Sequence, residues 1–176
     1  MRKLLILFLL QTLFIASVFS VEIKSDISFY AGLESIHDNR EAGGIPFKSA
    51  LSTEINSRIF NLDFEDFSFG PVGSAKMTGP TSAYGNVRIL GSSGFAVGIC
   101  GSYKLSDDFS LSLEAVTGFG LYGKNISYAS LDGAIRADYM LENIRLSAKT
   151  GVSYKRETVS LLCQIGFGID FPSWEI

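Results

Sequence analysis

The 176-residue sequence lacks several features that define common classes of protein. Two cysteines are too few for a disulfide-rich mini-protein or for a zinc site made of four cysteines. After residue 20, no apolar run approaches the roughly 20 residues that a membrane-spanning helix needs. A formal net charge of −3 argues against nucleic acid as a partner, because that would require a basic surface. The chain is nevertheless hydrophobic and rich in glycine, with 47% hydrophobic residues and 18 glycines.

The N-terminal residues have the three-part layout of a secretory signal peptide. Met1-Arg2-Lys3 is basic, Leu4–Ile15 is almost wholly apolar, and Val18-Phe19-Ser20 provides a small residue at a cleavage site. A membrane anchor is the alternative, but the apolar stretch is short and no stop-transfer charges follow it. We therefore predict a cleaved signal peptide over residues 1–20 and one mature domain over residues 21–176.

From Val21 onward, apolar and polar residues alternate with a period of two. This is the pattern of a β-strand that has one apolar and one polar face. The clearest examples are Phe109–Leu121, Ala129–Leu141, Ile144–Tyr154 and Val159–Phe171. Runs of about 11 to 14 residues exceed the five or six that are usual in soluble sheets, and they are long enough to cross a bilayer obliquely. Short polar connections between the runs favour antiparallel neighbours.

The alternation predicts eight strands, an even number that suits a closed antiparallel barrel. Their expected bounds are about 21–34, 47–56, 59–69, 94–105, 109–122, 126–141, 144–155 and 158–171. The phase of the pattern breaks near Asn56-Ser57, so we place a connection between the second and third strands there. Residues 83–90 are either a ninth strand or an extension of the fourth.

Alternation alone does not say which face of the barrel is inside. A soluble barrel would place its apolar face in the interior, whereas a membrane barrel would turn that face to lipid. The apolar faces are nearly pure along whole strands, as lipid contact requires, and the polar faces are rich in glycine and serine, as a narrow lumen favours. A closed barrel also satisfies its backbone hydrogen bonds without helices. The predicted fold class is therefore all-β, an eight-stranded antiparallel transmembrane barrel.

Two segments carry a resemblance to known membrane barrels: the hairpin Tyr103–Leu111 and the final strand Val159–Phe171. Together with the alternation over residues 21–171, they make the chain resemble the small eight-stranded outer-membrane barrels of Gram-negative-type bacteria (OmpA-like, OmpX-like or OmpW-like). The resemblance implies a bacterial outer-membrane location, contact with outer-membrane lipids and insertion by the barrel-assembly machinery; we expect a monomer. The chain departs from the family pattern because Pro172–Ile176 follow the final phenylalanine.

The expected lumen is narrow and charged. Eight strands leave an interior just wide enough for side chains to fill it. Acids and bases that point inward should pair, because an unpaired buried charge costs several kcal/mol. The predicted ion-pair network comprises Glu22, Lys24, Asp26, Glu114, Asp132, Arg136, Asp138, Arg145 and Lys149. We therefore expect a closed polar lumen, with a narrow pore or an OmpW-like conduit for small hydrophobic solutes as the alternative.

The remaining candidate residues do not form a catalytic or metal-binding set. His37 is the single histidine and falls in an expected loop over residues 35–46. Cys100 should point inward and Cys163 outward, so disulfide geometry excludes a bond between them. We predict no cofactor, no metal and no enzymatic activity, and a structural or surface-interaction role instead.

A long segment over residues 70–93 is the expected contact site for an extracellular ligand. It is rich in Gly, Pro, Ser and Thr, and it carries Lys76 and Arg88 without any acid. Long loops in compact domains are usually functional or disordered. A locally positive loop on an acidic protein would favour anionic polymers or surfaces, while a tolerated insertion is the alternative.

Overall fold

The computed structural model describes residues 22–38, 48–79, 92–122, 126–155 and 158–175. These residues form eight long strands and one short strand, all paired in antiparallel fashion. The strands are β1 (Glu22–Asp38), β2 (Lys48–Phe64), β3 (Phe67–Thr78), β4 (Ser92–Lys104), β5 (Phe109–Tyr122), β6 (Ile126–Leu141), β7 (Ile144–Lys155), β8 (Thr158–Asp170) and β9 (Trp174–Glu175). The described residues include no helix that is long and apolar enough to cross a membrane.

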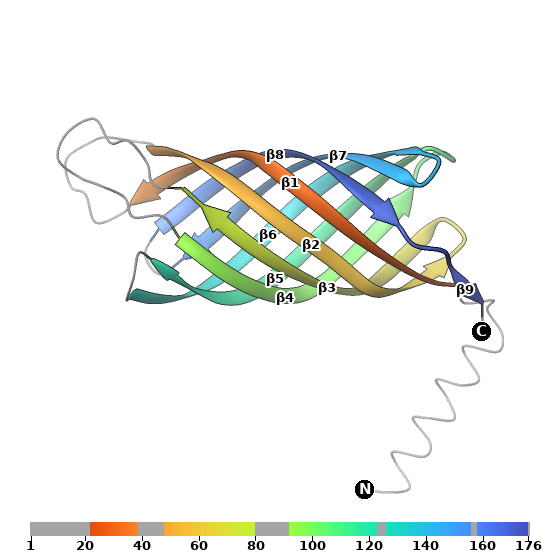
Figure 1. Cartoon of the computed structure of the whole chain (residues 1–176), viewed down its shortest axis with the longest axis horizontal. Coiled ribbons are helices and arrows are strands. Elements are labelled where there is room, and N and C mark those ends of the chain that lie inside the picture. The colour runs from red at the N-terminus through yellow and green to blue at the C-terminus, as the bar shows by residue number, and fades with distance from the viewer. Residues whose placement is uncertain (1–21, 39–47, 80–91, 123–125, 156–157, 176) are drawn as a thin grey trace, which may run out of the picture.

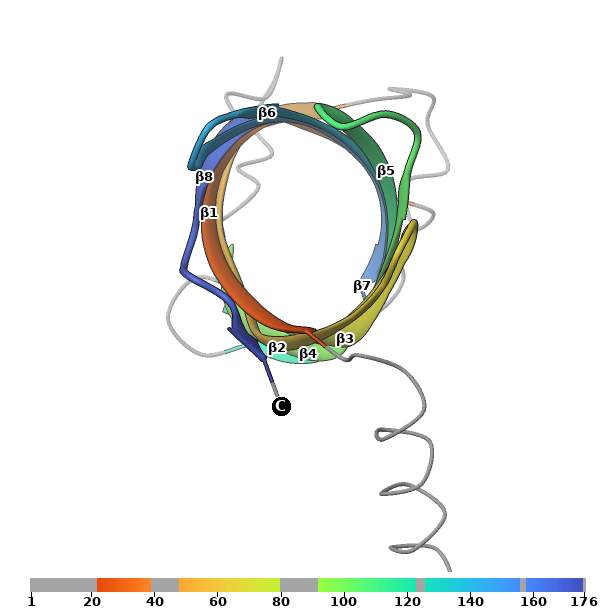
Figure 2. The ribbon, with the colours of Figure 1, turned by 90° about the vertical axis from the view of Figure 1, so that its right-hand side faces the viewer.

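The eight long strands close into a barrel. Each strand pairs with the next along the chain, and β1 pairs with both β2 and β8, so the sheet returns to its start. Figure 1 shows the strands tilted against the long axis, and Figure 2 shows the closed ring viewed from one end. Closure leaves no open sheet edge, which confirms the predicted fold class.

The two ends of the barrel differ in their connections. The described turns Glu65-Asp66, Leu105–Asp108 and Glu142-Asn143 join strands at one end, where β9 also lies (Figure 1). We call this the turn end. The connections that follow β1, β3, β5 and β7 join strands at the other end, the loop end, and apart from Gly79 they lie outside the described residues.

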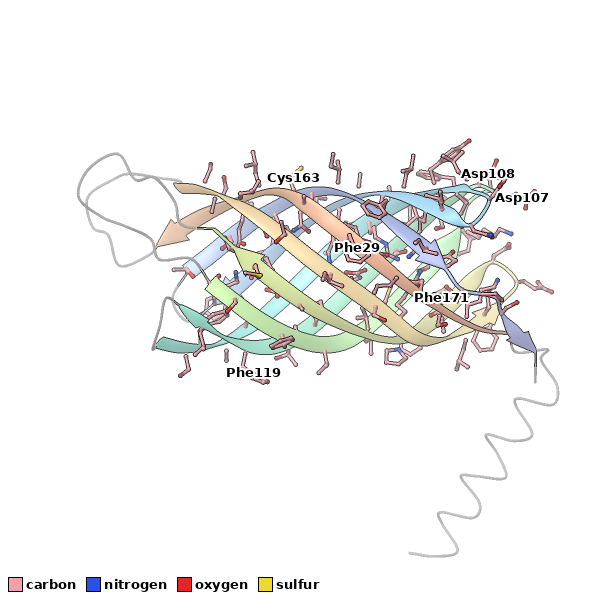
Figure 3. All side chains as sticks on the ribbon, in the orientation of Figure 1. Phe29, Asp107, Asp108, Phe119, Cys163 and Phe171 are labelled. Carbon is pink, nitrogen blue, oxygen red and sulfur yellow. The ribbon has the colours of Figure 1, made fainter. Side chains whose placement is uncertain are left out.

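The outer surface of the barrel is apolar. Ile165 is 74% exposed and Phe119 is 71% exposed, and large apolar side chains of every long strand share this outward orientation. Figure 3 shows Phe119 and Cys163 pointing away from the ribbon on opposite sides of the barrel. A soluble protein rarely exposes contiguous apolar surface on this scale. The inside-out pattern is therefore that of a barrel that faces hydrocarbon.

The predicted bounds of the second and third strands are wrong. β2 continues through Asn56-Ser57, and its connection to β3 is the turn Glu65-Asp66. An irregularity in the β2–β3 register between Arg58 and Leu62 explains the break in the hydrophobic pattern, because a bulge shifts the side-chain phase. Residues 83–90, where a ninth strand was an open alternative, lie outside the described residues.

Residues 70–78 belong to β3 and not to a long loop. Gly70-Pro71 has the composition of a turn, but these two residues lie in β3 opposite the irregular part of β2. Proline is tolerated at such a position because no ladder hydrogen bond to its nitrogen is needed there. The connection between β3 and β4 is correspondingly shorter than expected, and His37 lies within β1 and not in the expected loop over residues 35–46.

The C-terminal tail forms a short additional strand that the sequence did not predict. After β8 ends at Asp170, the Phe171 amide donates a hydrogen bond to the Ser25 carbonyl at 2.9 Å. Trp174 then pairs with Ile23 in the β1–β9 register. The tail therefore pairs with the first residues of β1, which β8 does not reach.

The apolar belt predicts a depth-dependent cost for a charged substitution. Replacing Ile165, near the middle of β8, with arginine should lower the free energy of unfolding by about 2–4 kcal/mol in lipid vesicles. The control Leu141→Arg, at the end of β6, should cost about 1 kcal/mol or less. Urea titration measures both values, and equal costs would contradict a lipid-facing surface.

Candidate functional site in the barrel lumen

The interior of the barrel is polar and contains buried salt bridges. Because side chains alternate across each strand, every long strand directs one set of residues inward. The inward set contains acids and bases that fall into three groups along the barrel axis. We describe them as the central group, the turn-end group and the loop-end group.

Arg136 of β6 is the centre of the first group and is fully buried. Its Nη1 donates to Glu114 Oε1 at 2.6 Å, and its Nε donates to Asp138 Oδ2 at 2.8 Å. The same Nη1 donates to the Tyr30 hydroxyl at 3.2 Å, across the lumen from β1. A guanidinium is suited to this position because its donors diverge in a fixed plane toward several acceptors.

Lys149 of β7 extends the central group toward β2. Its Nζ lies 2.7 Å from Glu114 Oε2 and 2.8 Å from Glu54 Oε1, so one ammonium serves two carboxylates. The same atom stands 5.2 Å from the centroid of the Tyr30 ring, within the range of a cation–π contact. Asn56 Nδ2 completes the group by donating to Glu114 at 3.2 Å.

The turn-end group is organised around Asp26 of β1. Arg58 donates to one oxygen of this carboxylate through Nε, and Arg145 donates to the other at 2.7 Å. Arg145 also reaches Asp170 at 2.7 Å, which links β7 to both β1 and β8. Gly168 makes room for this arrangement, since a Cβ there would lie 2.8 Å from Arg145 Nη2.

The loop-end group is centred on Glu34. Its carboxylate lies 2.8 Å from Lys155 Nζ and 3.2 Å from Lys76 Nζ, and it accepts a 2.8 Å hydrogen bond from Thr78. These partners come from β7 and β3, so this group too connects strands that are far apart in sequence. A buried carboxylate is tolerated because several donors compensate for its lost hydration.

The structure brings together six of the nine residues predicted for the lumen network. They are Asp26, Glu114, Arg136, Asp138, Arg145 and Lys149, and each takes part in at least one buried ion pair. Lys24 lies nearer the rim and pairs with Asp63 at 2.5 Å. Asp132 forms no ion pair with the described residues, and its Oδ1 has no hydrogen-bond partner among them. The side chain of Glu22 lies outside the described part of the chain.

Lys76 is not a loop residue, so its prediction as a loop contact is wrong. It lies in β3 and its ammonium is directed to Glu34, because β3 extends across residues that were expected to form a loop. Arg88, the second predicted loop contact, lies outside the described residues. Cys100 is buried and Cys163 is exposed, and both are free thiols, as predicted.

Sequence reasoning missed Glu54 and Arg58 of β2. The phase break near Asn56-Ser57 hid the continuity of this strand, so no inward set was assigned to it. The signal was nevertheless present, because Ser52, Glu54, Asn56 and Arg58 alternate without interruption. All four side chains are buried in the structure.

Two cavities lie beside the central group. A small cavity of about 20 Å³, about the size of one water molecule, is lined by polar residues such as Asp132, Ser153, Lys76 and Lys149 together with apolar side chains. A larger cavity of about 1080 Å³ lies at the turn end, where its floor includes Asp26, Arg145 and Asp138. We call it the turn-end cavity.

Comparison with known proteins supports the fold assignment. No protein-family model and no curated protein matches the sequence. Among solved structures, Neisserial surface protein A (NspA) is similar with a TM-score of 0.56 and 13% identity, covering 84% of this chain and 97% of that one. Ail, the attachment invasion locus protein of Yersinia pestis, is similar with a TM-score of 0.55 and 16% identity, covering 87% of this chain and all of that one. This chain therefore has the fold of the small eight-stranded outer-membrane β-barrels.

A further structure with this fold contains a ligand. It is Ail from Yersinia pestis in complex with the heparin analogue sucrose octasulfate, with a TM-score of 0.51 and 15% identity. The match covers 87% of this chain and all of that chain. At this level of identity the similarity is one of fold, and the ligand belongs to that protein.

Removal of the buried guanidinium of the central group should strongly lower the stability of the protein. Arg136→Met should lower the free energy of unfolding by about 3–5 kcal/mol, because Glu114 and Asp138 would lose a charged partner inside the barrel. Lys104→Met is the control: its side chain is 48% exposed and pairs with exposed Asp107, so it should cost less than about 1 kcal/mol. Similar costs in urea titrations would contradict the role assigned to Arg136.

Proposed function

We propose that the protein is a bacterial outer-membrane barrel with a closed lumen and a structural or surface-interaction role. The observation that carries this proposal is the series of buried ion pairs across the lumen, from Asp26 through Arg136 to Glu34. Each basic group in the three lumen groups is already bound to a carboxylate. Side chains that pair in this way occupy the middle of the lumen, which is narrow because the barrel has only eight strands.

The proposed cellular setting follows from the outer surface and the fold. The apolar belt supports contact with outer-membrane lipids, and insertion would then require the barrel-assembly machinery. In such barrels short turns face the periplasm and longer loops face outward, so the turn end of this chain would be periplasmic. We propose a monomer, because a closed barrel has no sheet edge to share.

A non-enzymatic role is part of the same proposal. In the central group, the acids Glu114 and Asp138 are held in ion pairs with Arg136. Surface interaction would then fall to the loop end. The predicted contact segment shortens to the connection between β3 and β4, residues 79–91, whose sequence contains Arg88 as its only charged residue.

The closed lumen predicts a low ionic conductance. Protein refolded into a planar bilayer should give no sustained single-channel current, because the central group obstructs the path between the ends. The double variant Lys149→Ala/Glu54→Ala should show brief channel openings more often than the unmodified protein. The second substitution removes a carboxylate that would otherwise lose its ion-pair partner. Stable channels in the unmodified protein would instead favour the narrow pore or hydrophobic-solute conduit.

Surface interaction predicts retention on an anionic glycan. By analogy with the Ail complex, the protein should bind immobilised heparin, and Arg88→Ala should lower the salt concentration needed for elution. Arg156→Ala, in the connection between β7 and β8, is the matched control and should change elution less. If the unmodified protein and both variants elute at the same salt concentration, Arg88 does not bind the glycan, and a purely structural role is favoured.

A further inference from the structure

A groove interrupts the apolar outer surface of the barrel. It has a volume of about 660 Å³ and crosses five neighbouring strands, β1, β8, β7, β6 and β5. Pockets that bind small molecules have volumes of about 300–1,000 Å³. The lining of the groove is mostly apolar, and it is continuous with the apolar belt described above.

The strand register explains why a groove forms here. One wall is a row of large side chains that are successive register partners on the five strands: Phe29, Phe167, Leu146, Tyr139 and Phe109. The rings of Phe29 and Phe167 pack with their centroids 5.5 Å apart. The next outward row has alanine on three of four strands (Ala31, Ala148 and Ala137), with Ile165 on the fourth. The alanine methyl groups leave a depression beside the wall.

The groove runs from the turn end to the middle of the barrel. Phe109 is the first residue of β5, and Tyr139 lies near the end of β6, so both stand at the turn end. Phe29 and Ala31 lie near the middle of β1. Figure 3 likewise shows Phe29 midway along the barrel and Asp108 at the turn end. The groove therefore follows the depth of one leaflet of a membrane that surrounds the barrel.

On the basis of the outer-membrane setting proposed above, we propose that this groove binds one acyl chain of a zwitterionic phospholipid from the leaflet at the turn end. An empty groove in hydrocarbon would forfeit van der Waals contacts, which drive association within a membrane. Outward rows of side chains repeat about every 7 Å along a strand. A groove one row wide therefore admits an extended hydrocarbon chain, whereas a helix about 10 Å or more in diameter is too broad.

The residues at the mouth of the groove favour a zwitterionic headgroup. Tyr139 is 47% exposed near a strand end, where tyrosine meets lipid headgroups and its hydroxyl can donate to an ester or phosphate oxygen. Asp108 is exposed beside Phe109, and its carbonyl accepts a 2.8 Å hydrogen bond from the Met140 amide, next to Tyr139. Its carboxylate would repel an anionic headgroup and attract the ammonium group of a zwitterionic one.

The test is native mass spectrometry of the protein after refolding into vesicles of phosphatidylethanolamine and phosphatidylglycerol in equal amounts and extraction into mild detergent. We expect one phosphatidylethanolamine molecule to remain on the barrel. Ala148→Phe and Ala137→Phe each fill the groove and should lower the ratio of lipid-bound to lipid-free barrel about tenfold. Ala115→Phe is the matched control, at an exposed alanine of β5 outside the groove, and should leave this ratio unchanged.

The groove is overturned as a lipid site if Ala148→Phe and Ala115→Phe retain lipid equally, or if the two phospholipids are retained equally. It is also overturned if cross-linking in the vesicles shows a dimer that Ala148→Phe abolishes, because the occupant is then a second copy of this chain. Electrophoretic heat-modifiability confirms that each variant is folded. A folded, inserted barrel that retains no lipid contradicts the groove alone, whereas failure to insert contradicts the proposed membrane setting as well.

Discussion

The constraint on which this structure depends is that no backbone hydrogen bond can be left open in hydrocarbon. Eight tilted strands meet it by closing into a ring in which β1 pairs with both β2 and β8. Closure at eight strands then determines the size of the interior, which is narrow. Because alternate residues must face inward, the polar half of every strand enters this small space. The charges therefore lie in the lumen because the barrel closes. They must form ion pairs there, because an unpaired buried charge would make the closed barrel unstable.

The ion pairs also favour one register of the strands around the ring. Arg145 on β7 binds Asp26 on β1 and Asp170 on β8, while Lys155 on β7 binds Glu34 near the other end of β1. These contacts form only when the strands have the observed register, since a shift of one residue would turn each charge toward lipid. Buried pairs of this kind contribute little net stability compared with apolar packing. Their contribution here is to penalise alternative registers, in which a charge would be buried without a partner.

The fold was predictable where the sequence keeps strict alternation. β5, β6 and β7 begin and end at the expected residues, because polar turns separate them and no bulge interrupts their pattern. The ends of β2 and β3 were not predictable, since the irregularity between Arg58 and Leu62 changes the phase and Gly70-Pro71 has the composition of a turn. For the lumen, alternation indicates which residues face inward but not which ones meet. The contact between Arg145 and Asp26 joins residues 119 positions apart, and it depends on the tilt and register of the whole ring.

The ion pairs occupy the middle of the lumen, and further acids lie at the turn end of the barrel. Two of these acids stand at unusual backbone positions. Glu65 and Glu142 are the first residues of two tight turns, and both have positive φ angles, of 48° and 55°. Glycine or asparagine would adopt this conformation at lower cost. Each glutamate therefore accepts a local backbone cost so that a two-residue turn can join neighbouring strands, because tight hairpin turns require positive φ angles.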